Sequence, residues 1–256
     1  MRADDASVLE RLDNLLFPFR PEERAGVRSR NQFVLATTRP GDERHHAYRD
    51  CRRLARSDSW TEVFDPVLAE INRRAIEEMD YFGTHAGVVS IGDRTIAFPA
   101  DSGEGKSTLV AACLQAGFEY VSDEALCLDY GDASVISYPK PLNLSRWSLE
   151  RLGLSVEEEV TTKVPVAPTE LGAIAVLLPR MLTDVVLLER MSGTPSLERL
   201  PTSSAMAALL TASFNHYKRP AETYALISKV ASATRASKIA YDEPKRAARL
   251  LLTTFG

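Results

Sequence analysis

The segment ADSGEGKS combines two glycines with a lysine and a hydroxyl group, a set of residues suited to holding phosphate. It falls one residue short of the Walker A pattern GxxxxGK[ST], because Ala100 stands in place of the first glycine. Backbone N–H groups converge on a phosphate only where no side chain blocks them, and Gly103 and Gly105 meet this condition. The Lys106 ammonium can then reach the outer phosphates, and the Ser107 hydroxyl can bind Mg²⁺.

A helix that begins near Lys106 would point its unpaired N–H groups and its positive dipole end at the same anion. An apolar strand pattern precedes the loop and a helical pattern follows it, which is the context that this motif requires. The alternative, a plain glycine-rich turn, explains the glycines but not the lysine and the hydroxyl at the helix start. The residues predicted to contact nucleotide phosphates are Asp101, Ser102, Gly103, Glu104, Gly105, Lys106, Ser107 and Thr108.

Two adjacent acids, Asp123 and Glu124, follow the first apolar strand after this helix. Such a strand returns to the neighbourhood of the loop, so its terminal acids would lie near the outer phosphate and its metal ion. Adjacent side chains of a strand point to opposite faces, and the two acids can act together only if the strand breaks there. The alternative is a pair of solvated acids at a strand end.

The remaining periodicity predicts an α/β fold with a mixed sheet and flanking helices. Gly92 and Asp93 form a turn signal between two apolar strands. Further strands are expected at 118–130, 134–139, 142–144, 171–179, 183–190 and 237–242, with helices at 106–116, 145–153, 202–214, 221–234 and 243–255. Residues 83–256 are therefore expected to form the phosphate-binding domain.

Residues 1–82 are expected to form a mostly helical segment packed on that domain. The patterns predict helices at 4–19, 42–57 and 61–82, with one short strand at 31–38. In this interpretation His45 and His46 lie on a solvated, arginine-rich helix face.

Composition excludes several classes of protein. The formal net charge of −4 argues against binding nucleic acid by bulk electrostatics. No apolar run reaches the roughly 18 residues of a membrane span, and the N-terminus lacks the apolar core of a signal peptide. The three cysteines form no CxxC pair, and we expect a cytoplasmic protein without a membrane partner. No NKxD motif for guanine is present, so ATP is the expected nucleotide.

Residues 84–129 resemble HPr kinase/phosphorylase, and more broadly the P-loop fold shared with ATP-dependent phosphoenolpyruvate carboxykinase. The resemblance rests on a leading strand histidine, His85, on the SGEGKS loop, on Gly117 after the helix and on the acid pair. The departures are Ala100, a glutamate at 124 in place of a second aspartate, and an N-terminal region unlike that of the family. A carboxykinase itself is disfavoured, because the chain is short and lacks an arginine-rich substrate site.

The resemblance implies roles for individual residues. Asp123 would accept the hydroxyl proton, His85 would lie beside the transferring phosphate, and Lys106 would hold it. Mg²⁺ would be bound by Ser107, Asp123 and Glu124. Lys140 and Arg146 are candidates for contacts with phosphate or substrate, although both could equally be solvated charges.

The resemblance therefore implies a divergent, ATP- and Mg²⁺-dependent kinase with an alcohol acceptor. The acceptor would be a serine or threonine of a peptide or protein, such as the precursor of a ribosomal peptide product, or a small hydroxyl metabolite. The alternative is a nucleotide-binding regulatory protein with little turnover. A homo-oligomer would fit the family, but no residue of the sequence indicates one.

Overall fold

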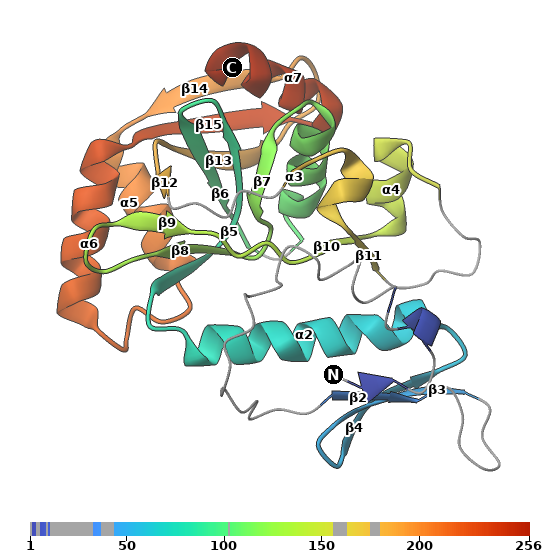
Figure 1. Cartoon of the computed structure of the whole chain (residues 1–256). Helices are drawn as coiled ribbons and strands as arrows, with labels where there is room; N and C mark the ends of the chain where they lie inside the picture. The colour runs from blue at the N-terminus through green and yellow to red at the C-terminus, as the bar shows by residue number, and fades with distance from the viewer. Residues whose placement is uncertain are drawn as a thin grey trace.

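A computed structural model of the chain describes residues 2–3, 6–8, 10, 33–36, 44–101, 103–155, 163–174 and 180–256. These residues form a large mixed sheet with helices on both faces. Below it in Figure 1 lie one long helix and then a smaller sheet. No helix within the described ranges combines the length and the apolar character needed to cross a bilayer.

The large sheet has nine strands among the described residues, in the order β12-β9-β8-β5-β6-β13-β15-β14, with β7 paired to β5. The strands β6, β13 and β15 run parallel, whereas β5 is antiparallel to β6, β7 and β8. This combination confirms the predicted mixed α/β sheet. The strand bounds are β5 Phe82–Ile91, β6 Arg94–Pro99, β7 Glu119–Ser122, β8 Ala125–Leu128, β9 Ser134–Ile136, β12 Arg180–Met181, β13 Asp184–Arg190, β14 Ser196–Leu200 and β15 Arg235–Tyr241.

Two groups of helices cover the two faces of this sheet. One core packs α3 Lys106–Gln115, α4 Arg146–Leu152 and α7 Pro244–Phe255 against one face. The other core packs α5 Thr202–Thr211 and α6 Pro220–Ala233 against the opposite face, as Figure 1 shows. A short ladder of β10 Leu142–Leu144 and β11 Val164–Val166, followed by the 3₁₀ helix η2 Pro168–Leu171, borders the first group.

Most of the predicted elements after residue 82 are confirmed. The segment expected as one strand at 118–130 is two strands, β7 and β8, with the acid pair between them. Residues 171–174 of the expected strand at 171–179 are not in a strand, and the rest of it lies outside the described residues. The strand β14 was not predicted.

The N-terminal part contains four strands and the helix α2 Trp60–Glu78 within the described ranges. The strands are β1 Arg2–Ala3, β2 Phe33–Ala36, β3 His45–Arg49 and β4 Arg52–Ser57, in that spatial order. Val63, Phe64 and Val67 of α2 are fully buried, and they pack with Leu35 and Ala47 of the small sheet. In Figure 1, α2 lies between the small sheet and the large one.

The prediction of a helix at 42–57 is wrong over its described residues, because residues 45–57 form the hairpin of β3 and β4. Asp50 makes the tight turn with a φ of +52°, which aspartate tolerates better than most residues. His46 is buried in this sheet rather than solvated on a helix. The strand at β2 and the helix at α2 were predicted, most of the expected helix at 4–19 lies outside the described residues, and the domain boundary at residue 82 stays a prediction.

Candidate functional site

The glycine-rich loop joins β6 to α3, as the sequence predicts. Gly103 and Gly105 have φ values of +92° and +96°, in the left-handed region that other residues avoid. Gly105 is the N-cap of α3, so the free N–H groups of the first helical turn begin directly after it. Ser102 lies outside the described residues. The described part of the loop therefore leaves the N–H groups at the start of α3 without side chains at Gly103 and Gly105 that would cover them.

Lys106 is buried, and its ammonium group folds back onto the loop that precedes it. Its Nζ donates hydrogen bonds to the carbonyl oxygens of Ala100, at 2.8 Å, and of Asp101, at 2.9 Å. Burial lowers the pKa of Lys106, while the negative charges of Asp123 and Glu124 oppose this change. The ammonium is thus held near the N-terminus of α3, and it has no direct ion pair among the described residues.

The acid pair lies where β7 ends and β8 begins. The Ser122 hydroxyl oxygen accepts hydrogen bonds from the backbone N–H groups of Glu124, at 3.2 Å, and Ala125, at 3.1 Å. These bonds satisfy the N–H groups that a broken strand would otherwise leave unpaired. The break removes the strict alternation of a strand, and both acids line the same cavity.

The carboxylate of Asp123 is the most deeply buried acid of the cavity, with 3% of the residue exposed. Its Oδ1 atom has no hydrogen-bond partner among the described residues. Burial raises the pKa of Asp123 to about 6, although Lys140 and a hydrogen bond from Ser107 favour the charged form. A buried carboxylate oxygen without a partner is costly, and this cost is offset when a ligand supplies a proton donor or a metal ion.

His85 lies on β5 beside the acid pair. Its Nδ1 is 3.0 Å from the backbone oxygen of Glu124, so Nδ1 donates and Nε2 is left as the acceptor of the neutral ring. Burial, reinforced by the charge of Lys106, lowers the pKa of His85. The Glu124 carboxylate in turn forms an ion pair with Lys140, at 3.2 Å. These contacts hold the histidine, the glutamate and the lysine as one group.

One cavity of about 300 Å³ joins these side chains to the loop. The described residues that line it are His85, Gly103, Gly105, Lys106, Ser107, Thr108, Asp123, Glu124, Lys140, Asn143, Ser145, Trp147, Ser148, Lys163 and Arg190. The structure therefore brings nine of the predicted site residues to one place.

Three predicted site residues lie outside this lining. Asp101 and Glu104 are exposed, because the Glu104 carboxylate turns back to accept a hydrogen bond from the Asp101 backbone N–H at 2.9 Å. Arg146 is exposed on α4 and pairs with Glu150 at 3.1 Å, so its guanidinium is directed along the helix surface. These three residues do not line the cavity, and their contacts with phosphate or substrate stay a prediction.

Sequence reasoning missed Arg190 and Trp147. The Arg190 guanidinium lies 5.3 Å from the Trp147 ring, and a Cβ at Gly105 would be 3.3 Å from its Nη2 atom. Arg190 is the last residue of β13, which runs parallel to β6. The carboxyl ends of parallel strands meet at one edge of a sheet, so the end of TDVVLLER was an available signal.

A second cavity, of about 280 Å³, adjoins the first and shares Gly105, Thr108, Trp147 and Arg190 with it. The Arg151 guanidinium also lies over the Trp147 ring, at 5.1 Å from its centroid. The aromatic ring and the two guanidinium groups form a wall suited to a flat, electron-rich group.

The site fits a magnesium nucleotide better than a metal held by protein alone. The described residues contain no cluster of three histidine, cysteine or carboxylate side chains that could hold a metal ion. Mg²⁺ commonly takes only one or two carboxylates and completes its shell with water and phosphate oxygens. Ser107 and Asp123 line the same cavity, and the Oδ1 atom of Asp123 has no hydrogen-bond partner among the described residues.

No family model and no curated protein matches the chain. Among solved structures, the chain is similar to the Hpr(Ser) kinase/phosphatase from Coxiella burnetii, with 17% sequence identity. The match covers 68% of this chain and 87% of the other, with a TM-score of 0.36. A likeness of this size carries no functional conclusion by itself, and the function of this site is inferred from its own geometry.

Proposed function

We propose that this chain is an ATP- and Mg²⁺-dependent kinase that transfers the γ-phosphate to an alcohol. The observation that carries the proposal is the position of Asp123. A buried carboxylate with an unpaired oxygen shares one cavity with the left-handed glycines and the lysine of a Walker A-like loop. A phosphate-binding loop alone would serve a regulator equally well, whereas the buried acid supplies a base for chemistry.

The loop and the second cavity divide the nucleotide between them. The backbone N–H groups from Gly103 to Thr108 would bind the phosphates, and Lys106 would exchange its two carbonyl partners for phosphate oxygens. The adjoining cavity beside Trp147 would receive the nucleoside, with Arg190 placed between the two parts.

Ser107 and Asp123 would hold Mg²⁺, with Glu124 close to it across the same cavity. When bound, Mg·ATP supplies the phosphoryl group and neutralises the charge that develops on its oxygens. Lys106 and Lys140 add two positive charges to the same space, and Glu124 fixes Lys140 through their ion pair.

Asp123 would take the proton from the acceptor hydroxyl as its oxygen bonds to phosphorus. With a pKa of about 6, the carboxylate is ionised at neutral pH and still basic enough to receive a proton. The bond between the γ-phosphorus and the bridging oxygen breaks, and ADP leaves with that electron pair. His85, oriented by its bond to the Glu124 backbone, offers Nε2 as a second polar contact.

The decisive test replaces the carboxylate with an amide of the same shape. Asp123→Asn is expected to lower phosphoryl transfer by about 10²-fold or more, because the general base is lost. Binding of ATP, measured by calorimetry, should change little, because the loop and Lys106 remain in place.

The alternative function is a nucleotide-binding regulator with little turnover, for which Asp123→Asn should not change phosphoryl transfer. Wild-type protein that binds Mg·ATP but shows no transfer above that of Asp123→Asn would favour the regulator. Wild-type protein that does not bind ATP at all would exclude both functions. Lys106→Ala is the companion variant, and it should weaken nucleotide binding itself.

A further inference from the structure

A third cavity, of about 610 Å³, lies between α2 and the segment around β10. We call it the α2 groove. One wall is made by the apolar side chains of Leu68, Ile71, Ala75 and Ile76. Its size lies within the range of about 300–1,000 Å³ that is usual for ligand sites. An apolar groove of this size has room for a molecule with an apolar surface.

The α2 groove adjoins the cavity of about 300 Å³ that holds Lys106 and Asp123, which we call the phosphate cavity. Glu124, Lys140 and Asn143 line both spaces. A molecule that lies along α2 therefore has one end beside the acid pair, where the acceptor hydroxyl has to be. The groove is therefore placed to receive the acceptor. The nucleoside is assigned to the second cavity, which lies beside Trp147.

Polar atoms at the junction indicate what the occupant carries. The Asn143 Nδ2 group donates to Asp65 at 3.0 Å, which fixes the amide orientation. Its Oδ1 atom is buried and has no hydrogen-bond partner among the described residues. An occupant with an N–H or O–H group at this point would satisfy that oxygen. A purely hydrocarbon ligand would leave it unpaired.

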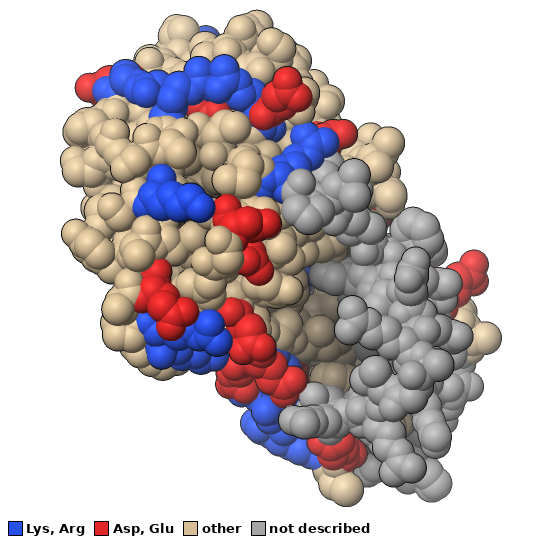
Figure 2. Space-filling view, turned by 60° about the vertical axis from the view of Figure 1, so that its left-hand side comes forward, with Lys and Arg blue, Asp and Glu red and all other residues tan. Residues whose placement is uncertain are grey.

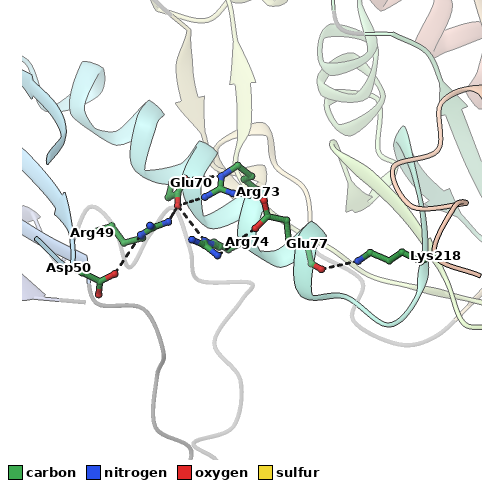
Figure 3. A network of polar contacts seen from close by, with 7 residues as sticks. All are labelled: Arg49, Asp50, Glu70, Arg73, Arg74, Glu77 and Lys218. Carbon is green, nitrogen blue, oxygen red and sulfur yellow. Dashed lines mark hydrogen bonds and ion pairs between the residues drawn. The ribbon is translucent and has the colours of Figure 1, made fainter. Parts of the chain in front are cut away.

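The wall formed by α2 is held in place from both sides. Glu70 accepts hydrogen bonds from Arg49 of β3 and from Arg73, and the Lys218 ammonium donates to the Glu77 backbone oxygen at 2.8 Å (Figure 3). On the groove side, the Tyr138 hydroxyl donates to Asn72 at 2.8 Å. The groove is thus preformed, and its occupant does not have to order the helix.

The dimensions favour an extended chain. From Leu68 to Glu77 the helix rises by about 14 Å, at 1.5 Å per residue. An extended peptide covers that distance with about four residues, at roughly 3.3 Å each. Ala69, Arg73 and Glu77 along the rim are exposed, so the groove is open along its length as a peptide requires.

We propose that the α2 groove binds the phosphate acceptor, and that the acceptor is an extended peptide segment with apolar side chains next to its serine or threonine. This inference rests on the proposed kinase function. The hydroxyl reaches Asp123, a backbone N–H of the peptide pairs with Asn143, and the neighbouring apolar side chains pack on Leu68, Ala75 and Ile76.

The test uses the full chain, radiolabelled Mg·ATP and three probes. The first is a set of short synthetic peptides with one serine between leucine and valine, the second has asparagine and lysine in those places, and the third is 1-hexanol. We expect label on the first set, at least about tenfold more than on the second. Equal labelling of the two peptide sets, or labelling of the alcohol alone, would overturn the proposal. Turnover of ATP without label on any peptide would do the same.

A variant of the groove provides the second measurement. Ala75→Phe places a ring in the α2 groove and should raise KM for the apolar peptide about tenfold, with ATP affinity unchanged. Ala225→Phe makes the same change at an exposed position of α6 and should leave KM unaltered. Equal KM values for the two variants would exclude the groove as acceptor site.

The outcomes separate this inference from the proposed function. Transfer that depends on Asp123 but ignores the groove variants removes the inference and leaves the kinase. If the wild-type protein does not bind ATP, or if Asp123→Asn transfers phosphate at the full rate, both the proposed kinase function and this inference are excluded.

Discussion

The functional interpretation of this site depends mainly on one carboxylate, that of Asp123. Asp123 is buried among apolar strands, and one of its oxygens has no partner among the described residues. Folding would be easier with an amide or an apolar side chain at this place, because desolvation disfavours the charged form. A residue that is costly for stability and lines a cavity beside a glycine-rich loop is typical of a functional group.

The cost should be measurable as a pH-dependent stability. The pKa of Asp123 rises from 3.8 to about 6 on folding, so between these values the folded protein binds a proton that the unfolded chain has released. Stability from this group falls as the pH rises through that window and stays low above it, by about 3 kcal/mol in total. Asp123→Asn should therefore increase the free energy of unfolding at about pH 8 by up to this amount.

At about pH 4 the same variant should differ much less from the wild type, because Asp123 is then neutral in the folded protein and only partly ionised in the unfolded chain. Urea unfolding at the two pH values is the measurement. A variant that is destabilised equally at both values would show that the carboxylate makes a structural bond that the amide cannot replace.

At the scale of elements, the site forms at two places where a strand is interrupted. The loop after β6 and the gap between β7 and β8 meet because β5 pairs with both β6 and β7. Each break depends on one local device, which is a left-handed glycine in the first case and a serine hydroxyl in the second. Changes at either device should affect the site more than the overall fold.

Gly105→Ala tests the first device. A side chain at a φ of +96° costs about 1–2 kcal/mol, and the new methyl group would press on Arg190. We expect weaker ATP binding together with a modest loss of stability. Gly92→Ala is the matched control, because Gly92 also has positive φ but lies in the β5–β6 turn with open space around it. Equal ATP affinity of the two variants would contradict the role given to the loop.

Ser122→Ala tests the second device. Loss of the hydroxyl leaves two backbone N–H groups without their acceptor and should cost about 1–3 kcal/mol. Transfer should fall with it, because the break orients Asp123. Ser90→Ala removes another fully buried hydroxyl, on β5, and should lower stability without changing transfer per folded molecule. A fall of transfer in both variants alike would mean that only stability matters.

At the scale of the whole molecule, the N-terminal part supplies α2, which forms a groove together with residues of the larger part of the chain. The helix α2 packs some of its apolar residues on the small sheet, and others line the α2 groove. Lysines and arginines alternate with acids over the face seen in Figure 2, without a field of one sign. On this face the charges support ion pairing within the molecule rather than attraction of a polyanion.

Glu70→Gln tests how α2 is joined to the small sheet. Glu70 is largely buried and contacts Arg49, Arg73 and Arg74, so loss of its charge should cost about 1–3 kcal/mol by urea unfolding. Glu78→Gln changes an exposed acid at the end of the same helix and should cost almost nothing. If the two variants were equally stable, the network in Figure 3 would not hold the helix.

The error over residues 42–57 shows where local patterns fail. This segment is rich in charge and lacks the glycine that usually marks a hairpin turn, so its composition favours a surface helix. In the structure β3 pairs with both β2 and β4, and the burial of His46 and Ala47 follows from those neighbours. Strand formation depends on such partners more than on intrinsic preference.

The amino-acid sequence by itself determined the loop, the helix after it, the place of the acid pair after the next apolar segment and the mixed class of the sheet. These features lie within about thirty consecutive residues or rest on short-range patterns, whose geometry follows from backbone sterics and hydrogen bonding. The tertiary structure alone decided that Asn143 and Trp147 join the site and that α2 forms the wall of a groove. Their positions depend on strand order and helix packing between distant segments, and no local pattern records those contacts.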